Sequence, residues 1–193
     1  NLNVGNIYCY QKLYRKAFQE YSKRSKTPSR QMNLSNVRLC LGEYDEAVKE
    51  AECGLDLLPK PPRADTWRAG LLENKMCALM SMQCPDGARN AFNEEYPNPA
   101  IAKDKSVKTC YCLALLLAGD NNTFGTTISN DEVLSDDDKH LLYGIRSMRS
   151  DERPTAMEYF RLRDGYDAPC EVLPDSLLLE RLRAEFRQRS LRR

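Results

Sequence analysis

The chain has little of what most enzymes and metalloproteins use for their chemistry. Its 193 residues include a single histidine, His140, and its eight cysteines form no C-x-x-C pair. The nucleotide-binding motifs G-x-x-x-x-G-K-[ST] and G-x-G-x-x-G are missing, as are the catalytic motifs G-x-S-x-G and H-E-x-x-H. The single histidine and the missing C-x-x-C pair argue against a structural zinc site. We therefore expect no metal, no cofactor and no enzymatic activity, with an unrecognised Cys/His site as the alternative.

Long hydrophobic runs are also missing. The longest apolar stretch, residues 110–118, is far too short to cross a bilayer, and no signal peptide is visible at the N-terminus. Valine and isoleucine are scarce beside leucine and alanine, which disfavours β-sheet. Hydrophobic residues make up 41% of the chain and charged residues 30%, as in an ordinary globular domain. The composition thus predicts an all-α protein without membrane insertion.

The formal net charge of +1 gives the whole chain no strong electrostatic preference. Basic residues gather in segments 12–30 and 181–193, and acidic residues gather in 131–138. Such blocks are usually solvated faces or interaction tails. Because no nucleic-acid-binding module accompanies them, we expect no nucleic-acid partner. Ser135 and the aspartates after it read as the cap and acidic first turn of a helix that carries His140.

The cysteines fall mainly inside apolar helical stretches rather than at paired spacings. Buried free thiols in a reducing compartment are the better interpretation of that placement. We therefore expect a cytoplasmic protein without disulfide bonds.

A pattern occurs twice near the N-terminus. Residues 3–6 read N-V-G-N and residues 33–36 read N-L-S-N, and each is followed at the same distance by Tyr-x-x-Ala, which ends at Ala17 or Ala47. The first part of each copy has helical spacing, and its small residue, Gly5 or Ser35, is expected where two helices approach closely. A break follows at 12–13 or 42–43, and a second helix comes next. Pro59 stops the second copy. Each copy therefore predicts an antiparallel helical hairpin, and the repetition predicts a stack of them.

The segment 41–59, L-G-E-Y-D-E-A-V…P, resembles the second half of a tetratricopeptide repeat. This resemblance implies an α-α superhelix, a solenoid of four to five hairpins over residues 1–168, the first of which looks truncated. Ala88 with Phe92 fits a third unit. Residues 141–144 with Ala156 and Phe160 fit another. Residues 119–125 are interpreted as a loop and 121–130 as a poor second helix. Residues 169–193 are interpreted as an amphipathic capping helix, with a basic amphipathic helix that binds a partner or a membrane surface as the alternative.

The spacing of apolar residues, prolines and glycines predicts the helix boundaries. The expected helices lie near residues 1–11, 13–25, 29–40, 45–58, 65–82, 86–94, 104–118, 136–149, 153–163 and 174–190.

The family resemblance also implies a site. First helices of such repeats line a concave groove, where an asparagine often holds the backbone of a peptide; the alternative is that it bonds within the stack. The groove residues expected on this basis are Asn3, Asn6, Met32, Asn33, Asn36, Leu39, Asn74, Cys77, Met80, Leu141 and Met148. Methionine and leucine in such a groove suit an apolar or helical segment.

The expected function is a non-catalytic adaptor or scaffold that binds a peptide segment of another protein. One alternative is a co-chaperone that clamps acidic C-termini, which needs basic residues beside the asparagines. Leu2 does not meet that need, and Arg63 and Arg68 match it only loosely. Another alternative is a bacterial secretion chaperone or a peptide-sensing regulator built on the same repeat. The sequence leaves homo-oligomerisation open.

Overall fold

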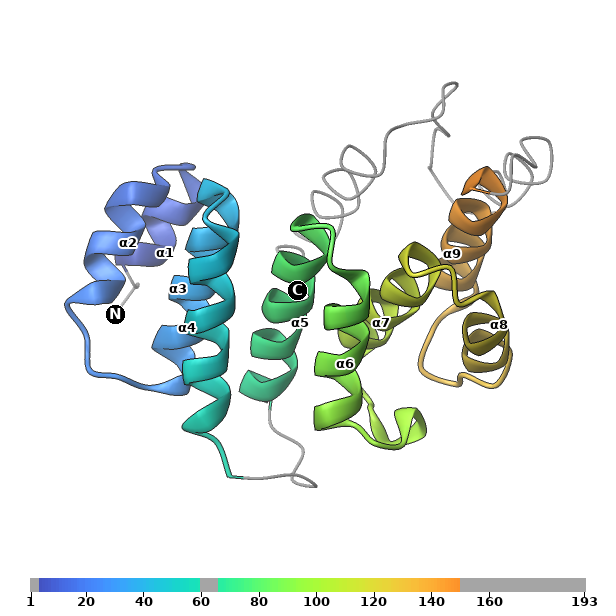
Figure 1. Cartoon of the computed structure of the whole chain (residues 1–193). Helices are drawn as coiled ribbons and strands as arrows, with labels where there is room; N and C mark the ends of the chain where they lie inside the picture. Colours follow the sequence, from blue (N-terminus) through green and yellow to red (C-terminus); the bar gives the residue numbers. More distant parts are fainter. Residues whose placement is uncertain (1–3, 60–65, 150–193) are drawn as a thin grey trace. The chain divides into compact units, whose positions relative to one another are not determined.

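The computed structural model describes residues 4–59 and 66–149, and all regular structure in them is helical, which confirms the all-α class. Two compact units divide the chain, residues 1–118 and 119–193. The helices of the first unit are α1 (Val4–Tyr10), α2 (Tyr14–Ser22), α3 (Pro28–Leu41), α4 (Tyr44–Asp56), α5 (Thr66–Ser81), α6 (Pro85–Glu95) and α7 (Lys105–Leu117), with a 3-10 turn at Pro99–Ile101 (Figure 1). Those of the second are α8 (Asn121–Ser129) and α9 (Asp136–Arg149).

One turn geometry recurs along the chain. Lys12, Gly42, Gln83 and Gly119 all have a positive φ, between 59° and 78°, and each lies two positions before the start of a helix, α2, α4, α6 or α8. Glycine adopts this left-handed conformation without strain, whereas lysine and glutamine do so at a cost. The breaks predicted at Lys12-Leu13 and Gly42-Glu43 are thus real turns, and the same turn follows α5 and α7.

Local capping explains where several helices begin and end. Thr27 accepts a hydrogen bond from the backbone amide of Arg30, and Pro28 supplies the preset φ of the first position of α3. Gly42 ends the same helix in the left-handed conformation. Asp104 caps α7 by accepting from the backbone amides of Ser106 and Val107.

The segment 119–125 is not a loop as the sequence predicted, because α8 begins at Asn121. The carboxylate of Asp120 accepts a hydrogen bond from the backbone amide of Thr123 and caps the helix. Phe124 and Ile128, one turn apart, are both fully buried. Capping and tertiary burial therefore outweigh the poor helix propensity of asparagine, threonine and glycine in this segment.

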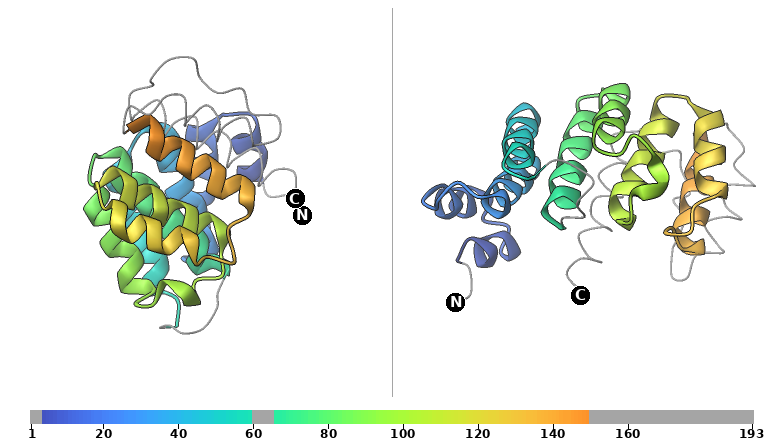
Figure 2. Two further views of the ribbon diagram at one scale, coloured as in Figure 1. Left: turned by 90° about the vertical axis from the view of Figure 1, so that its right-hand side faces the viewer. Right: turned by 90° about the horizontal axis from the view of Figure 1, so that it is seen from below.

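Consecutive helices of the first unit pack against one another as hairpins, from α1 on α2 to α6 on α7 (Figures 1 and 2). In addition, α3 packs on α5, and α5 packs on α7. Within residues 4–59 and 66–118, no contact of similar extent joins α2 to α4 or α4 to α6. From α3 onward, the first helices of the hairpins are thus closer together than the second helices. This places α3, α5 and α7 on the inner side of the stack.

Small residues sit where helices approach closely, as the repeat pattern predicted. A Cβ atom on Gly5 would lie 2.5 Å from Cε1 of Tyr21, so α1 reaches α2 only because Gly5 lacks a side chain. Ser35 donates a hydrogen bond of 2.8 Å from its hydroxyl to the main-chain carbonyl of Ala47, which links α3 to α4. Ala47 itself is fully buried. These positions fix the phase of the first two hairpins.

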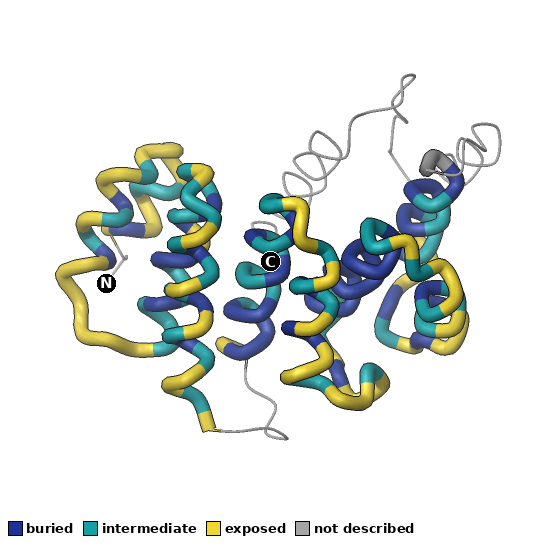
Figure 3. The backbone as a smooth tube through the Cα atoms, in the orientation of Figure 1, coloured by how far each residue is buried: buried dark blue, intermediate teal, exposed yellow. Residues whose placement is uncertain are grey.

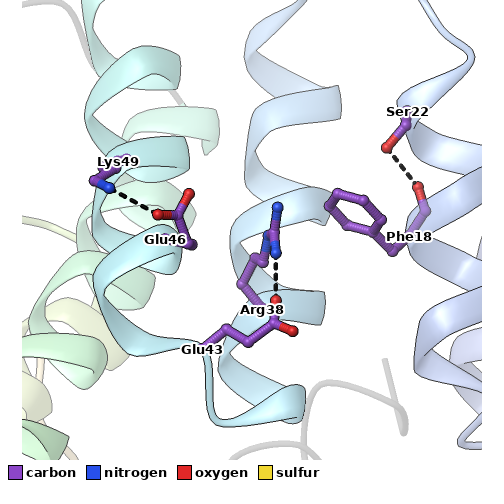
Figure 4. Close-up of polar contacts among 6 residues, drawn as sticks. All are labelled: Phe18, Ser22, Arg38, Glu43, Glu46 and Lys49. Atoms are coloured by element: carbon purple, nitrogen blue, oxygen red, sulfur yellow. Dashed lines mark hydrogen bonds and ion pairs between the residues drawn. The ribbon is translucent and has the colours of Figure 1, made fainter.

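Arg38 links the first hairpin to the second. Its guanidinium lies 4.2 Å from the centroid of the Phe18 ring on α2 and pairs with the carboxylate of Glu43 before α4 (Figure 4). The planar group can stack on a ring and bind a carboxylate at once. Figure 4 also shows the pair formed by Lys49 and Glu46, 2.7 Å apart on the exposed side of α4. That exposed pair contributes little to stability.

The second unit has its own packed aromatic contact. The rings of Phe124 on α8 and Tyr143 on α9 meet edge to face, with centroids 5.9 Å apart. Asp138 and Ser135 cap α9 reciprocally, since the backbone amide of each residue donates to the side chain of the other. This confirms the predicted acidic helix start. The helices expected at 153–163 and 174–190, and the capping segment 169–193, lie outside the described residues.

Candidate functional site

The inner side of α3 presents an open face. Its members recur at helical spacing, so they share one side of the helix, and they are half-buried except for one that is exposed. Leu34, on the opposite side of the helix, is buried in the stack, and so is Val37. The open face consists of Ser29, Met32, Asn33, Asn36 and Cys40, of which Asn36 is the exposed member. Figure 3 shows this alternation of buried and open positions along the helices.

A second half-buried face lies on α5. Its members again recur at intervals of three or four residues, and Leu71 and Leu72 on other sides of the helix are fully buried. The face consists of Gly70, Glu73, Asn74, Cys77 and Ser81. We call these two sets of residues together the inner face.

The two helices meet along a seam between α3 and α5. The side-chain amide of Asn74 donates a hydrogen bond of 3.1 Å to the main-chain carbonyl of Met32. A Cβ atom on Gly70 would lie 2.5 Å from the sulfur of Met32, so the glycine makes room for that thioether. Asn74 therefore bonds within the stack, which is the alternative that the sequence left open for the groove asparagines.

A similar seam joins α5 to α7. The sulfur atoms of Cys77 and Cys110 lie 3.8 Å apart. The hydroxyl of Ser106 lies 2.8 Å from a carboxylate oxygen of Glu73 and 2.8 Å from one of Asp104. Burial raises the pKa of Glu73, the hydrogen bond from Ser106 partly opposes this, and the charge of Asp104 raises it further. Glu73 therefore holds its proton more readily than an exposed glutamate does.

Several of the predicted groove residues are not on an open face. Leu39 is buried against Ala47 and Ala78, and Met80 and Leu141 are buried as well. The expectation that they line a groove is corrected by this burial, since apolar side chains between helices form the packing itself. Asn3 and the side chain of Met148 lie outside the described part of the chain.

Asn6 is exposed on α1. Its side-chain oxygen accepts a hydrogen bond of 2.6 Å from the hydroxyl of Tyr21. Its side-chain oxygen therefore already accepts a hydrogen bond between α1 and α2.

Asn33 and Asn36 remain open. Asn33 is half-buried and Asn36 is exposed. Among the described residues, neither side chain makes a hydrogen bond to another residue, so both carboxamides can donate and accept outside the stack. Met32 and Cys40 flank them on the same face.

Cys40 and Glu73 lie on the inner face but are not among the groove residues predicted from the sequence. Cys40 lies seven residues after Asn33, and that spacing returns to the same side of a helix. Leu39 was named in its place, one residue early, which amounts to a rotation of about 100° around the axis. Glu73 had no visible signal, because its role on the inner face depends on Ser106 of a later helix.

Comparison with known proteins finds a likeness in structure and none in sequence. No protein-family model matches the chain, and no curated protein matches it in sequence. Among solved structures, it resembles the crystal structure of YrrB, described as a TPR (tetratricopeptide repeat) protein with an unusual peptide-binding site. The TM-score is 0.55 with 16% sequence identity, over 95% of this chain and 90% of that chain. The chain has the fold of a TPR protein. At this identity, the likeness extends to the fold and not to the site.

In TPR terms, α3 and α5 are the first helices of their hairpins, and the inner face is the side that they present. Arg68 on α5 is not available to a ligand there. It is buried, pairs with Glu95 and donates to the main-chain carbonyl of Pro59. Arg63 lies outside the described residues. Arg68, which the sequence matched only loosely to a clamp for acidic C-termini, is therefore engaged within the stack.

The described residues contain neither a metal-binding cluster nor a membrane-spanning helix. No group of three histidine, cysteine, aspartate or glutamate side chains is placed to hold a metal ion in this part of the chain. No helix within residues 4–59 and 66–149 has the length and apolar character needed to span a bilayer.

Proposed function

We propose that this TPR-fold chain is a non-catalytic interaction module that binds a peptide segment of another protein along the inner face of α3 and α5. The observation that carries the proposal is the pair of open carboxamides, Asn33 and Asn36. Other polar groups on this face, such as the amide of Asn74, already bond within the stack. A carboxamide both donates and accepts, which matches the donor and acceptor of a peptide group.

The spacing of the two asparagines fits an extended ligand. Side chains three residues apart on a helix have Cβ atoms about 5–6 Å apart. An extended peptide advances about 3.3 Å per residue, so two carboxamides at this spacing can bind peptide groups one or two residues apart. The half-buried thioether of Met32 and thiol of Cys40 add apolar contacts beside them. Backbone pairing would supply affinity, and the flanking side chains would select apolar residues in the ligand.

The character of the inner face favours an uncharged or apolar segment over an acidic one. None of its named residues on α3 or α5 is basic. Arg68 is buried within the stack, so it offers no positive charge to a ligand carboxylate, and Glu73 on the same face is acidic rather than basic. A co-chaperone that binds acidic C-termini through this face is thus less well supported than a general peptide-binding adaptor.

The test begins with affinity capture on the wild-type chain and identification of bound segments by mass spectrometry. A synthetic peptide of the captured segment is then titrated against the double variant Asn33→Ala, Asn36→Ala. Each lost amide pairing costs about 0.5–1.5 kcal/mol, so the affinity should fall by about tenfold or more. Asn6 was also predicted to line the groove, but it is unsuitable for this test, because removal of its side chain would break its hydrogen bond to Tyr21.

Asn93→Ala is the matched control, since Asn93 is an exposed asparagine on α6, a second helix. It should leave the affinity unchanged. Equal affinity of the double variant and the control would contradict the proposal. A photo-reactive group at position 36 should also cross-link to the peptide, whereas one at position 93 should not.

A further inference from the structure

The outer side of α1 carries an apolar stripe that nothing in the described structure covers. Val4, Ile7 and Tyr10 lie three residues apart, and their exposed fractions are 45%, 36% and 67%. On the opposite side of the helix, Gly5 is buried against the ring of Tyr21. The exposed stretch along α1 is visible in Figure 3. Single exposed apolar residues are normal on a protein surface, but a continuous stripe marks a contact surface.

The stripe has the shape that a helix would fit. Within the described residues, α1 packs extensively only on α2, whereas α3 packs on α2, α4 and α5. Residues spaced by three form one of the ridges through which helices pack into each other's grooves. The open side of α1 is therefore equivalent to a side that a neighbouring helix covers on α3.

The charge around the stripe selects among possible occupants. Lys12 follows α1 directly and is exposed, and the ammonium group of Lys16 lies 5.9 Å from the centroid of the Tyr8 ring on α1. Both belong to segment 12–30, which contains seven basic residues and one acidic residue, Glu20. A second copy placed on the stripe by two-fold symmetry would bring these like charges together. The C-terminal segment 181–193, with six arginines and one glutamate, also has the wrong sign.

We propose that the stripe formed by Val4, Ile7 and Tyr10 is a second docking site, which binds an acidic amphipathic helix of a partner protein. The apolar side of that helix packs on the stripe, and its carboxylates lie beside Lys12 and Lys16. This site is independent of the inner face, because it uses the outer side of α1 and makes no use of Asn33 or Asn36.

The experiment compares two labelled helical peptides that share a leucine stripe and differ in carrying only glutamate or only lysine at the polar positions. Fluorescence anisotropy with the full chain should show binding of the glutamate peptide, weakened by added salt, and much weaker binding of the lysine peptide. The variant Ile7→Glu, Tyr10→Glu should reduce the affinity for the glutamate peptide by about tenfold or more. Leu57→Glu, at an apolar residue that is 42% exposed at the end of α4, should not.

The single variant Tyr10→Glu is a control for misfolding of α1 in the double variant, since Tyr10 is the most exposed residue of the stripe. It should retain the thermal stability of the wild type and still weaken binding. The proposal is overturned if both peptides bind equally, if neither binds, or if Tyr10→Glu and the double variant bind as the wild type does. It is also overturned if sedimentation shows a dimer that the double variant abolishes, because the occupant would then be a second copy. Asn33→Ala with Asn36→Ala should leave this binding intact, which separates the outcome from that of the inner face.

Discussion

The side-chain amide of Asn74 on α5 donates its hydrogen bond to the main-chain carbonyl of Met32 on α3, 42 positions earlier in the chain. An asparagine that looked like a ligand-binding residue in the sequence is thus a connection between two hairpins. This relationship separates structural asparagines from those that remain open.

Asn74→Ala should therefore reduce stability rather than peptide affinity. Loss of the hydrogen bond should lower the free energy of unfolding by about 0.5–1.5 kcal/mol, measured by urea titration. Asn36→Ala, at an exposed position of α3, should change it by much less. If the two variants were equally stable, the bond between α5 and α3 would contribute nothing.

The recurring left-handed turn predicts opposite effects for two substitutions. Gly42 has a φ of 77° and open space around its Cα, so Gly42→Ala should be destabilising by about 1 kcal/mol through backbone strain alone. Lys12 has a φ of 59°, so Lys12→Gly should relieve strain and raise the melting temperature. Thermal unfolding followed by circular dichroism gives both values, and a loss of stability in Lys12→Gly would show that the lysine is not strained there.

Glu73 predicts a pH effect of defined sign. Burial raises its pKa above the ordinary value of 4.5, so the folded protein keeps the proton at pH values where the unfolded chain has lost it. The contribution of Glu73 to stability is therefore fully present below pH 4.5 and is lost as the pH rises through the folded pKa. Glu73→Gln should raise the melting temperature relative to the wild type at pH 7, and the difference should shrink at pH 4. A difference that is the same at both pH values would mean that Glu73 does not hold its proton.

The thiols should react in an order set by their exposure. Among the cysteines that the structure describes, Cys84 is exposed and should react first with a thiol reagent, whereas Cys110 and Cys112 are buried and should react only after unfolding. Cys9 should react slowly, because burial raises its pKa, although its hydrogen bond to Tyr21 works in the opposite direction. Mass spectrometry of the labelled protein over time gives the order. Early labelling of Cys110 would show that α7 is less well covered than the structure indicates.

The first two hairpins could be predicted from the sequence because their small residues have a direct structural cause. Gly5 and Ser35 stand where helices approach, and Gly42 stands where the backbone turns left-handed. Close helix contacts and left-handed turns both favour small residues, so they can be recognised from the sequence. The fold class followed from this repetition.

The helix α8 and the candidate site were harder to predict from the sequence. The helix α8 depends on burial of Phe124 and Ile128, which outweighs a local composition that favours a loop. At the site, the sequence predicted Leu39 as a groove residue, but Leu39 is buried and its neighbour Cys40 is the half-buried residue of the open face. The hydrogen bond from Asn74 to Met32 joins different hairpins, and so does the one from Ser106 to Glu73. The spacing of residues within one helix cannot predict such bonds.

The position of α1, with one extensive neighbour, has a kinetic consequence. Within the described residues, α1 can open by breaking its one extensive interface, with α2, whereas α5 must break its interfaces with α3, α4, α6 and α7. The backbone amides of α1 should accordingly exchange with deuterium faster than those of α5. A helix bound to Val4, Ile7 and Tyr10 would give α1 a second interface, and its binding would be detected as slower exchange of the α1 amides.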